Sequence, residues 1–389
     1  IMKAIQIPIM KQSEKIKVMT IVGTRPEIIR LSQVIKELDR TTNHILVHTG
    51  QNYDYELSEI FFKDLGLRKP DYFLAAAGAN ATKTVAQIIA TVDDVFLKEQ
   101  PDAALVLGDT NSALSLYAAK RRKIPTFHME AGNRCFDERT PEEINRRIVD
   151  HMSDINLVYS ERARDYLLRE GMPPDRVIKT GSPMFEVLNA HRSAIDASTI
   201  LNTHDLTKGK YFVASFHREE NITSDRALDG IINGLTKIAA EYDMPCIVST
   251  HPRTQKRMDE RGIKTPDGLR FLKPLGFFDY VKLQIDAACV ISDSGTLSEE
   301  ASILNLPAVM LREAHERPEA SDEASVIMAG VSETRIRQAV ALAIEQAQGN
   351  ERIFRLVGDY SMPNVSQKVV RIILGYTDYV KRRVWHEYV

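Results

Sequence analysis

Acidic and basic side chains crowd the run from His128 to Arg147, which joins a predicted strand at Pro125–Met129 to a predicted helix. Loops in this position often carry chemistry. Glu130 stands just past the predicted strand, and Glu142 and Arg146 are four residues apart, on one face of the helix. Such carboxylates can exchange protons with a ligand, although Glu142 and Arg146 alone could also form an exposed ion pair of little energetic value.

The start of that helix carries a capping signal. Thr140 is the predicted N-cap, Pro141 fits the first turn, and Glu143 follows the cap by three residues. This pattern predicts a capping box, in which the Glu143 carboxylate returns to the backbone of the cap. Glu143 thereby has a structural role, whereas Glu142 and Arg146 remain available for a functional one.

A third carboxylate follows the predicted strand Ala103–Leu107. Asp109 could cap the helix after it, since Asp is common at strand-to-helix turns. Alternatively, it joins Glu130 and Glu142 at the strand ends of one domain. Neighbouring carboxylates with arginines nearby can be tuned apart in pKa, as acid-base catalysis requires.

The turn Gly23–Glu27 follows the first predicted strand and places Pro26 in the first turn of a helix. It could present backbone amides and Arg25 to an anion, or Arg25 could be a solvated loop residue. The turn is not the dinucleotide fingerprint G-x-G-x-x-G, which occurs nowhere in the chain. An NAD-dependent mechanism therefore lacks its usual sequence support.

Two histidines follow predicted strands in the second half of the chain. His217 comes after Tyr211–Ser215, and His251 comes after Pro245–Ser249. A lone histidine is usually structural, but two at matching strand ends indicate a binding or catalytic site. Neither has the spaced partners of a metal site, so no metal is expected.

The strongest anion-binding signal is the segment Ser292–Glu300, in which a strand ends, a glycine follows, and a helix begins. The free amides and dipole of that helix suit a diphosphate around Ser294 and Gly295. Glu300, like its neighbour, would repel the anion unless one of them turns towards sugar hydroxyls. Arg317 could add a cation after the next strand. The alternative is a capped helix without a ligand.

Strand-like and helix-like segments alternate along most of the chain, which predicts α/β domains with parallel sheets. The rhythm lapses in a polar segment, 189–209, and then resumes. We expect an extension at 1–15, a Rossmann-like domain at 16–188, a linker at 189–209, a second Rossmann-like domain at 210–364 and a C-terminal helix at 365–389 that crosses back over the first domain. Ligands of such sheets bind beyond the carboxyl ends of the strands.

Composition narrows the class of partner. The chain has 389 residues, 51 basic and 53 acidic side chains, and a formal net charge of -2. This balance gives no reason to expect nucleic acid or an anionic membrane, and no segment is long and apolar enough to span a bilayer. The partner is expected to be small. Three cysteines without paired or metal-ligand spacing predict buried thiols in a reducing cytoplasm.

Six motifs in order resemble the non-hydrolysing UDP-N-acetylglucosamine 2-epimerase family: Gly23–Glu27, Gly108–Thr110, His128–Gly132, Pro141–Arg146, Asp293–Gly295 and Glu316–Glu319. The resemblance covers the chain from Lys17 onwards. It implies two Rossmann-like domains in the glycosyltransferase-B arrangement, a UDP-sugar in the cleft between them, no NAD and no metal. It also implies a C-terminal helix that returns to the first domain and, as is common in this family, a homodimer.

The same resemblance implies roles for individual residues. The implied catalytic acids and bases are Asp109, Glu130, Glu142 and, near the leaving diphosphate, His217. The implied substrate-binding residues, with the strand-end His251, are Arg25, Arg30, Arg146, His251, Tyr280, Ser294, Gly295, Glu300 and Arg317. Tyr280 would lie by the uracil and Glu300 by the ribose. Arg30 stands where the commonest family pattern has lysine, and because arginine does not deprotonate, it is not expected to transfer protons.

Two segments suggest a subgroup. Val47–Tyr55 and Asn133–Asp137 replace what the simple epimerases carry and are similar to enzymes that make UDP-N-acetyl-L-fucosamine from UDP-2-acetamido-2,6-dideoxy-L-talose for surface polysaccharides such as capsule or O-antigen. The alternatives are an ordinary UDP-N-acetylglucosamine 2-epimerase, a hydrolysing relative, a glycosyltransferase of the same architecture, and a non-catalytic UDP-sugar sensor. A proton on C2 without an adjacent carbonyl favours elimination and re-addition of UDP over direct proton abstraction.

Overall fold

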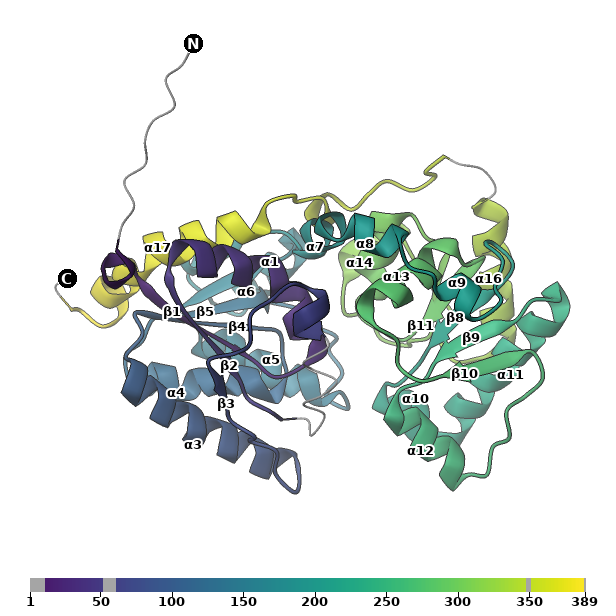
Figure 1. The fold of residues 1–389 in the computed structure, drawn as a ribbon, viewed down its shortest axis with the longest axis horizontal. Coiled ribbons are helices and arrows are strands. Elements are labelled where there is room, and N and C mark those ends of the chain that lie inside the picture. Colours follow the sequence, from purple (N-terminus) through teal and green to yellow (C-terminus); the bar gives the residue numbers. More distant parts are fainter. Residues whose placement is uncertain (1–10, 52–60, 348–350, 388–389) are drawn as a thin grey trace, which may run out of the picture.

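The computed structural model of the chain describes residues 11–51, 61–347 and 351–387. Two sheets, each covered by helices, form two domains side by side (Figure 1). The first sheet has the strand order β3-β2-β1-β4-β5-β6-β7 and the second has the order β10-β9-β8-β11-β12-β13. All pairings between these strands are parallel. The predicted α/β class with two Rossmann-like domains is confirmed.

The first domain begins with a short 3-10 helix, η1 (Gln12–Glu14), although residues 1–10 of the predicted extension lie outside the described chain. Its strands are β1 (Lys17–Val22), β2 (Asn43–His48), β3 (Tyr72–Phe73), β4 (Ala103–Leu107), β5 (Thr126–Ala131), β6 (Ile155–Val158) and β7 (Val177–Lys179). Its helices are α1 (Arg25–Thr41), α3 (Ala81–Glu99), η2 (Asn111–Ser115), α4 (Leu116–Arg121), α5 (Pro141–Met152), α6 (Glu161–Arg169), η3 (Pro174–Arg176) and α7 (Met184–Ala190).

The strands of the second domain are β8 (Phe212–Ser215), β9 (Cys246–Ser249), β10 (Leu269–Leu272), β11 (Cys289–Ser292), β12 (Ala308–Met310) and β13 (Ile327–Met328). Its helices are α10 (Glu219–Thr223), α11 (Asp225–Tyr242), α12 (Pro252–Glu260), α13 (Phe277–Asp286), α14 (Leu297–Leu304), α15 (Pro318–Asp322) and α16 (Glu333–Gln346). The chain then runs through η4 (Gly358–Tyr360) into α17 (Val365–Val384).

The segment 189–209 contains two short helices, α8 (Arg192–Asp196) and α9 (Ile200–Thr203). It packs onto the second domain, because the Ser198 hydroxyl donates to Asp279 of α13 at 2.5 Å and Ile200 is buried beside Tyr211. The crossing between the domains is therefore ordered by contacts with α13.

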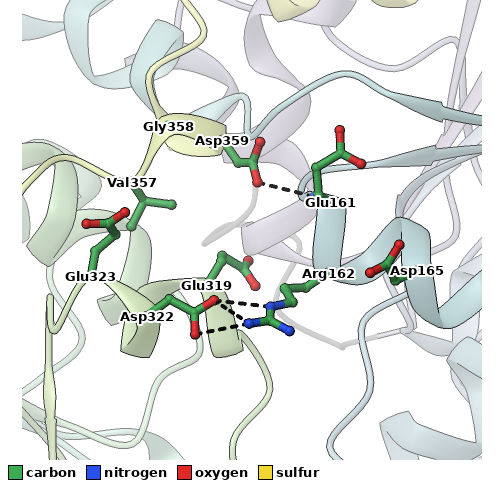
Figure 2. Close-up of a pocket in the computed structure, with 9 residues that line it drawn as sticks. All are labelled: Glu161, Arg162, Asp165, Glu319, Asp322, Glu323, Val357, Gly358 and Asp359. Carbon is green, nitrogen blue, oxygen red and sulfur yellow. Dashed lines mark hydrogen bonds and ion pairs between the residues drawn. The ribbon is translucent and has the colours of Figure 1, made fainter.

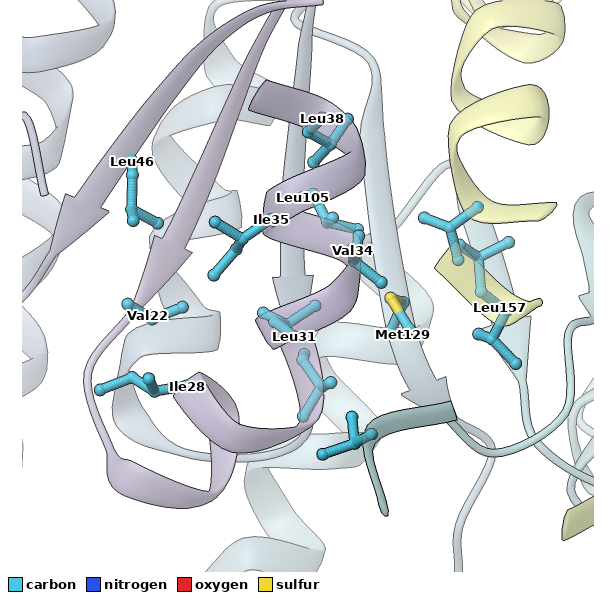
Figure 3. Packing of buried hydrophobic residues seen from close by; sticks show 14 of the residues in the cluster. Val22, Ile28, Leu31, Val34, Ile35, Leu38, Leu46, Leu105, Met129 and Leu157 are labelled. Carbon is cyan, nitrogen blue, oxygen red and sulfur yellow. The ribbon is translucent and has the colours of Figure 1, made fainter. Parts of the chain in front are cut away.

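Helix α1 shows why the first domain forms around its sheet. Ile28, Leu31, Val34, Ile35 and Leu38 recur at helical spacing and are all fully buried (Figure 3). They pack in one cluster with side chains from β1, β2, β4, β5 and β6. Each fully buried aliphatic side chain of this size contributes about 1.5–3 kcal/mol of burial free energy, so this face of α1 fixes the helix on the sheet.

Helix α17 crosses back from the second domain and lies along α1 (Figure 1). Its Val365, Val369, Ile373 and Val380 are buried in the same apolar cluster as α1. Basic side chains occupy its last turn, where their positive charge interacts favourably with the helix dipole. The core of the first domain is thus completed by the last helix in the described chain.

The strand order of each sheet reverses between two strands, β1 and β4 in the first and β8 and β11 in the second. Ligand sites of open parallel sheets lie beyond the carboxyl ends of the strands at such switch points. All three cysteines are free and buried, as predicted. Across the described residues, no helix is both long and apolar enough to cross a membrane.

Candidate active site

Glu130 lies within β5, one residue further into the sheet than the sequence predicted. Its φ is +64°, and the pairing of β5 with β6 shifts register between Met129 and Ala131. A bulge of this kind re-aims a side chain, and such bulges are common next to active sites. The predicted strand end at Met129 was wrong, because the irregularity lets β5 continue to Ala131.

The Glu130 carboxylate lies between two arginines. Arg30 of α1 donates to Glu130 and, at 2.5 Å, to Glu299 of α14. Arg317 donates to Glu130 at 2.7 Å and lies 3.4 Å from Glu299. Two cations and two anions thus alternate in a buried ring that joins the domains. Mutual pairing offsets the desolvation cost of these charges.

Asp109 lies in a second ionic cluster. Arg146 of α5 donates to the Asp109 carboxylate from Nε at 2.9 Å and from Nη2 at 2.6 Å. The same Nη2 donates to Glu316 of the second domain. Burial raises the pKa of Asp109, Arg146 lowers it, and Glu316 raises it. A carboxyl group poised in this way suits proton transfer.

Arg146 is not part of a surface ion pair. Its side chain is only 2% exposed, and its carboxylate partners in the described chain are Asp109, Glu143 and Glu316 rather than Glu142. Glu142 is half-buried, and its negative charge acts to raise the pKa of His217 and of Arg218 in the second domain. The structure therefore separates the two residues that the helix periodicity grouped.

The capping box predicted at Thr140 is wrong. Thr140 is the N-cap of α5 but makes no side-chain capping bond. The Glu143 carboxylate instead accepts from the Cys135 amide at 3.0 Å and pairs with Arg147 at 3.1 Å. Because Glu143 anchors the loop before the helix, it is drawn away from the cap.

The turn after β1 also differs from its prediction. Glu27 accepts from the amides of Gly23 at 2.9 Å and Thr24 at 2.6 Å, so an internal carboxylate binds two amides that were expected to face an anion. Arg25 lies at this turn, with its guanidinium carbon 5.3 Å from the centre of the Phe61 ring. After β4, Thr110 caps η2 and leaves the Asp109 carboxylate to Arg146.

The two predicted histidines lie together. Their rings stack with centroids 5.4 Å apart, and His217 Nδ1 is 3.3 Å from the Asp293 carboxylate. His251 also caps α12 by accepting from the Arg253 amide at 3.2 Å. Asp293 accepts from the amides of His217 and Arg218, both at 2.9 Å. It thereby holds the loop after β8 against the loop after β11.

Gly295 is the point of closest packing in the predicted anion-binding loop. A Cβ atom there would lie 2.9 Å from a Glu316 oxygen and 3.2 Å from an Arg317 nitrogen. Only glycine admits both side chains without displacement. Ser294 is turned to Thr296, with 3.0 Å between their hydroxyl oxygens. The loop therefore carries Arg317 and small polar groups at the start of α14.

Tyr280 and Glu300 form another corner of the site. Gln284 donates to the buried Glu300 carboxylate at 2.7 Å. Burial raises the pKa of Glu300 and of the Tyr280 phenol, and the Glu300 charge raises that of Tyr280 further. The sequence alone left open whether Glu299 or Glu300 turns towards the sugar. In the structure, Arg30 donates to Glu299 and Gln284 donates to Glu300.

Three acidic residues with central contacts were not predicted as site residues: Asp293, Glu299 and Glu316. Each has partners on another element, and Glu316 is 170 positions from Arg146. The available signals were that Asp293 opens one of the six motifs and that Glu316 immediately precedes Arg317 in another. Pairing between domains is not visible in local spacing.

A hollow of about 280 Å³ lies elsewhere on the seam between the domains (Figure 2). Its acidic lining includes Glu161, Glu319 and Asp322, and Arg162 crosses it to Asp322 at 3.0 Å. None of the predicted site residues lines it. Within the described ranges, no group of three or more His, Cys, Asp or Glu side chains is arranged to hold a metal ion.

Residues 36–374 match the UDP-N-acetylglucosamine 2-epimerase family. The structure of that enzyme from Rickettsia bellii is 51% identical, with a TM-score of 0.89 over 96% of this chain and 100% of that one. The Methanocaldococcus jannaschii enzyme in complex with UDP-GlcNAc and UDP is 31% identical, with a TM-score of 0.86 over 92% and 100%. UDP-2,3-diacetamido-2,3-dideoxy-D-glucuronate 2-epimerase of Pseudomonas aeruginosa is 34% identical over 76% of this chain and 83% of its own length.

The two facing α/β domains and their shared ionic site define an isomerase that acts on a sugar nucleotide. The chain belongs to the non-hydrolysing UDP-N-acetylglucosamine 2-epimerase family. The predicted family, enzyme class and glycosyltransferase-B-like architecture are confirmed, and the general activity is 2-epimerisation of a UDP-sugar.

Proposed function

We propose that the chain converts UDP-2-acetamido-2,6-dideoxy-L-talose to UDP-N-acetyl-L-fucosamine for surface polysaccharide synthesis. The observation that carries a C2 epimerisation here is that three carboxylates of the first domain lie by arginines of the second. Glu130 accepts from Arg317, and the charge of Arg218 interacts with those of Asp109 and Glu142. Proton transfer needs the carboxylates, and a diphosphate leaving group needs the cations.

The proposed reaction is an elimination followed by re-addition. A carboxylate removes the C2 proton while the bond between C1 and the UDP oxygen breaks, which gives a 2-acetamidoglycal and UDP. The UDP oxygen then adds back to C1, and a proton is delivered to the opposite face of C2. Asp109, Glu130 and Glu142 are the proposed acids and bases, with His217 beside the leaving diphosphate.

The binding roles follow the same division. Arg317, Ser294 and Gly295 are proposed to face the diphosphate, with His251 and Arg25 nearby, while Glu300 and Tyr280 hold the ribose and uracil. Arg30 and Arg146 are proposed to orient Glu130 and Asp109 towards the sugar, in support of which each donates to its carboxylate.

The loop 133–137 supports a sugar-specific role. The buried Asn133 amide lies 3.4 Å from the Glu130 carboxylate. The next residue, Arg134, forms ion pairs with Asp150 at 2.7 Å and Glu170 at 2.6 Å. A rigid loop beside a proposed catalytic carboxylate can discriminate between sugars. Residues 52–55 of the other subgroup segment lie outside the described chain.

UDP-N-acetylglucosamine is the second candidate substrate. The family description and the ligands of the M. jannaschii complex favour it, whereas the P. aeruginosa relative indicates that family members differ in their sugar. Both reactions invert C2 and use the same proposed residues, so the substrate has to be decided by assay.

The deciding experiment is NMR of the purified protein in deuterium oxide with each sugar nucleotide separately. We expect inversion and deuterium at C2 with the 6-deoxy-L-talose nucleotide, and slower or no conversion of UDP-N-acetylglucosamine. A product unlabelled at C2 would refute the elimination. Faster conversion of UDP-N-acetylglucosamine would instead reassign the substrate and leave the mechanism intact.

The same incubation would also reveal any departure from the activity of the family. A glycosyltransferase would leave the sugar nucleotide unchanged without an acceptor, a hydrolysing relative would release free sugar and UDP, and a sensor would bind without conversion.

A homodimer in the cytoplasm remains our expectation, and light scattering after gel filtration would measure the oligomeric state.

A further inference from the structure

Glu316 is a buried carboxylate surrounded by arginines. It lies in the loop before α15, accepts from Arg312 at 2.6 Å and lies 3.3 Å from Arg218. It also accepts from Arg146, which belongs to the other domain. Its side chain is only 7% exposed, and these arginines hold its pKa well below the ordinary value. Glu316 is therefore an anion within a cationic cage.

The contact with Arg146 matters because of what that guanidinium already binds. A single nitrogen, Nη2, donates to both Asp109 and Glu316, and Nε gives Asp109 its second bond. Asp109 and Glu316 thus compete for the same nitrogen of the guanidinium, while the third partner, Glu143, lies 3.4 Å from Nη1. A shift of the guanidinium towards one of them weakens its hold on the other.

Charged groups of both domains act on the pKa of Asp109. Arg146 of α5 and Arg218 after β8 stabilise its anion, whereas Glu316 before α15 and Glu130 of β5 oppose it. Arg146 and Glu316 also touch each other, so Glu316 acts on Asp109 both directly and through the shared arginine. Glu130 is occupied separately by Arg30 and Arg317.

We propose that Glu316 is a positioning residue for the proton-transfer site: by holding Arg146 from the second domain, it limits how much of that arginine's charge reaches Asp109. The proposal deepens the proposed function, on which it rests for the catalytic role of Asp109. It assigns a task in proton transfer to a residue that is not required to touch the substrate.

The test is E316Q, which keeps the side-chain shape and removes the charge. Two changes then act in the same direction on Asp109: a neighbouring anion is lost, and Arg146 is released towards its carboxylate. We expect the Asp109 titration to move to lower pH by about one pH unit. Carboxyl carbon NMR of protein labelled at aspartate follows this titration, with D109N identifying the signal.

The same shift should be visible in the pH profile of kcat/KM, which reports the free enzyme. The limb governed by Asp109 should move with the NMR titration, on whichever side of the optimum it falls. A merely structural Glu316 would lower kcat/KM at every pH and leave that limb in place. An unmoved Asp109 titration in folded E316Q would overturn the proposal.

Two further variants complete the design. E313Q removes the same charge from an exposed residue in the same loop and should leave the Asp109 titration unchanged. E316D keeps the charge but withdraws it from Arg146, so it should move the titration down by less than E316Q. If E316Q does not fold, an unmoved titration in E316D would overturn the proposal.

The NMR titration needs no turnover, so it separates this inference from the proposed function. Absence of C2 labelling in deuterium oxide would refute the elimination but leave the coupling between Glu316 and Asp109 testable. Conversely, an unchanged titration with normal labelling would refute the coupling alone.

Discussion

Glu130 is held on both sides by arginine, which fixes its carboxylate at one position relative to the second domain. We expect E130Q to lower kcat by at least about 100-fold, because an amide cannot exchange the proton that an acid-base residue must transfer. Steady-state kinetics would measure the loss, and circular dichroism would show that the variant folds.

The matched control is E138Q, at an exposed residue of the same loop. It removes an equal charge without touching the ring and should retain wild-type turnover. Wild-type turnover in E130Q would remove Glu130 from the catalytic residues, whereas equal losses in both variants would point to a general charge effect.

Arg30 contacts two carboxylates on two domains, Glu130 and Glu299. Lysine, the commoner residue at this position of the family pattern, presents a single ammonium rather than a planar fork. We therefore expect R30K to fold and to lose about tenfold in kcat/KM. Kinetics that match the wild type would show that one of the two contacts suffices.

At the scale of elements, the start of α14 depends on a side chain that is absent. A methyl group at Gly295 would lie 2.9 Å from Glu316 and 3.2 Å from Arg317. We expect G295A to weaken UDP binding by about tenfold or more, since misplacing a charged contact by an ångström costs this much. Titration calorimetry with UDP would measure it.

Gly375 provides the control, because a Cβ atom there meets nothing within 4 Å. G375A lies on α17, away from the ionic site, and should leave UDP binding unchanged. UDP affinity in G295A equal to that of G375A would show that Glu316 and Arg317 move aside without consequence.

The turn between β1 and α1 predicts a pH effect on stability. Burial raises the pKa of Glu27 from 4.5 to about 7, against hydrogen bonds from Thr24, Thr110 and Gly23 that lower it. The folded protein thus binds this proton more tightly than the unfolded chain. This tighter binding of the proton stabilises the fold by up to about 3 kcal/mol. The stabilisation is complete below about pH 4.5 and is lost as the pH rises through about 7.

E27Q cannot titrate, so its thermal midpoint should fall less than that of the wild type between pH 5 and pH 8. Comparing the two proteins across this range cancels the other titrating groups. Parallel curves would show that the hydrogen bonds keep Glu27 ionised in the folded protein.

Local patterns predicted most of the fold but little of the pairing within the site. Strands β1, β4 and β8 are short apolar runs, and this local pattern alone predicted them. Strands β3 and β13 were not predicted, because each pairs over two residues at a sheet edge and carries little pattern. Helices α8 and α9 are too short for a clear period and are held by α13.

The candidate site shows the same division between local and distant information. Asp109 and His217 follow strands, and a sequence can place strand ends. Arg30, a partner of Glu299, and Arg146, a partner of Glu316, come from the other domain, so these pairs are determined only when the two sheets face each other. Glu143 was misassigned because its contact with Cys135 competes with the local cap.

At the scale of the whole molecule, stability of the first domain depends on α17. Ile373 is 1% exposed and packs in the cluster that contains α1, whereas the adjacent Leu374 is 64% exposed. We expect I373A to lower the free energy of unfolding by about 2–5 kcal/mol and L374A to change it by no more than about 0.5 kcal/mol.

Urea unfolding followed by fluorescence would measure both variants, which lie at adjacent positions of one helix and remove the same number of atoms. Similar losses would show that α17 is not seated on α1 in solution. A loss confined to I373A would establish the helix as part of the first domain's core.

The path of α17 also affects how the protein is made. The face of α1 that α17 covers is synthesised early, but its cover is the last helix of the described chain. During translation, that apolar face stays open until the whole second domain has left the ribosome. We expect the nascent first domain to need protection from aggregation during this interval, and its folding to finish only after translation has passed the second domain.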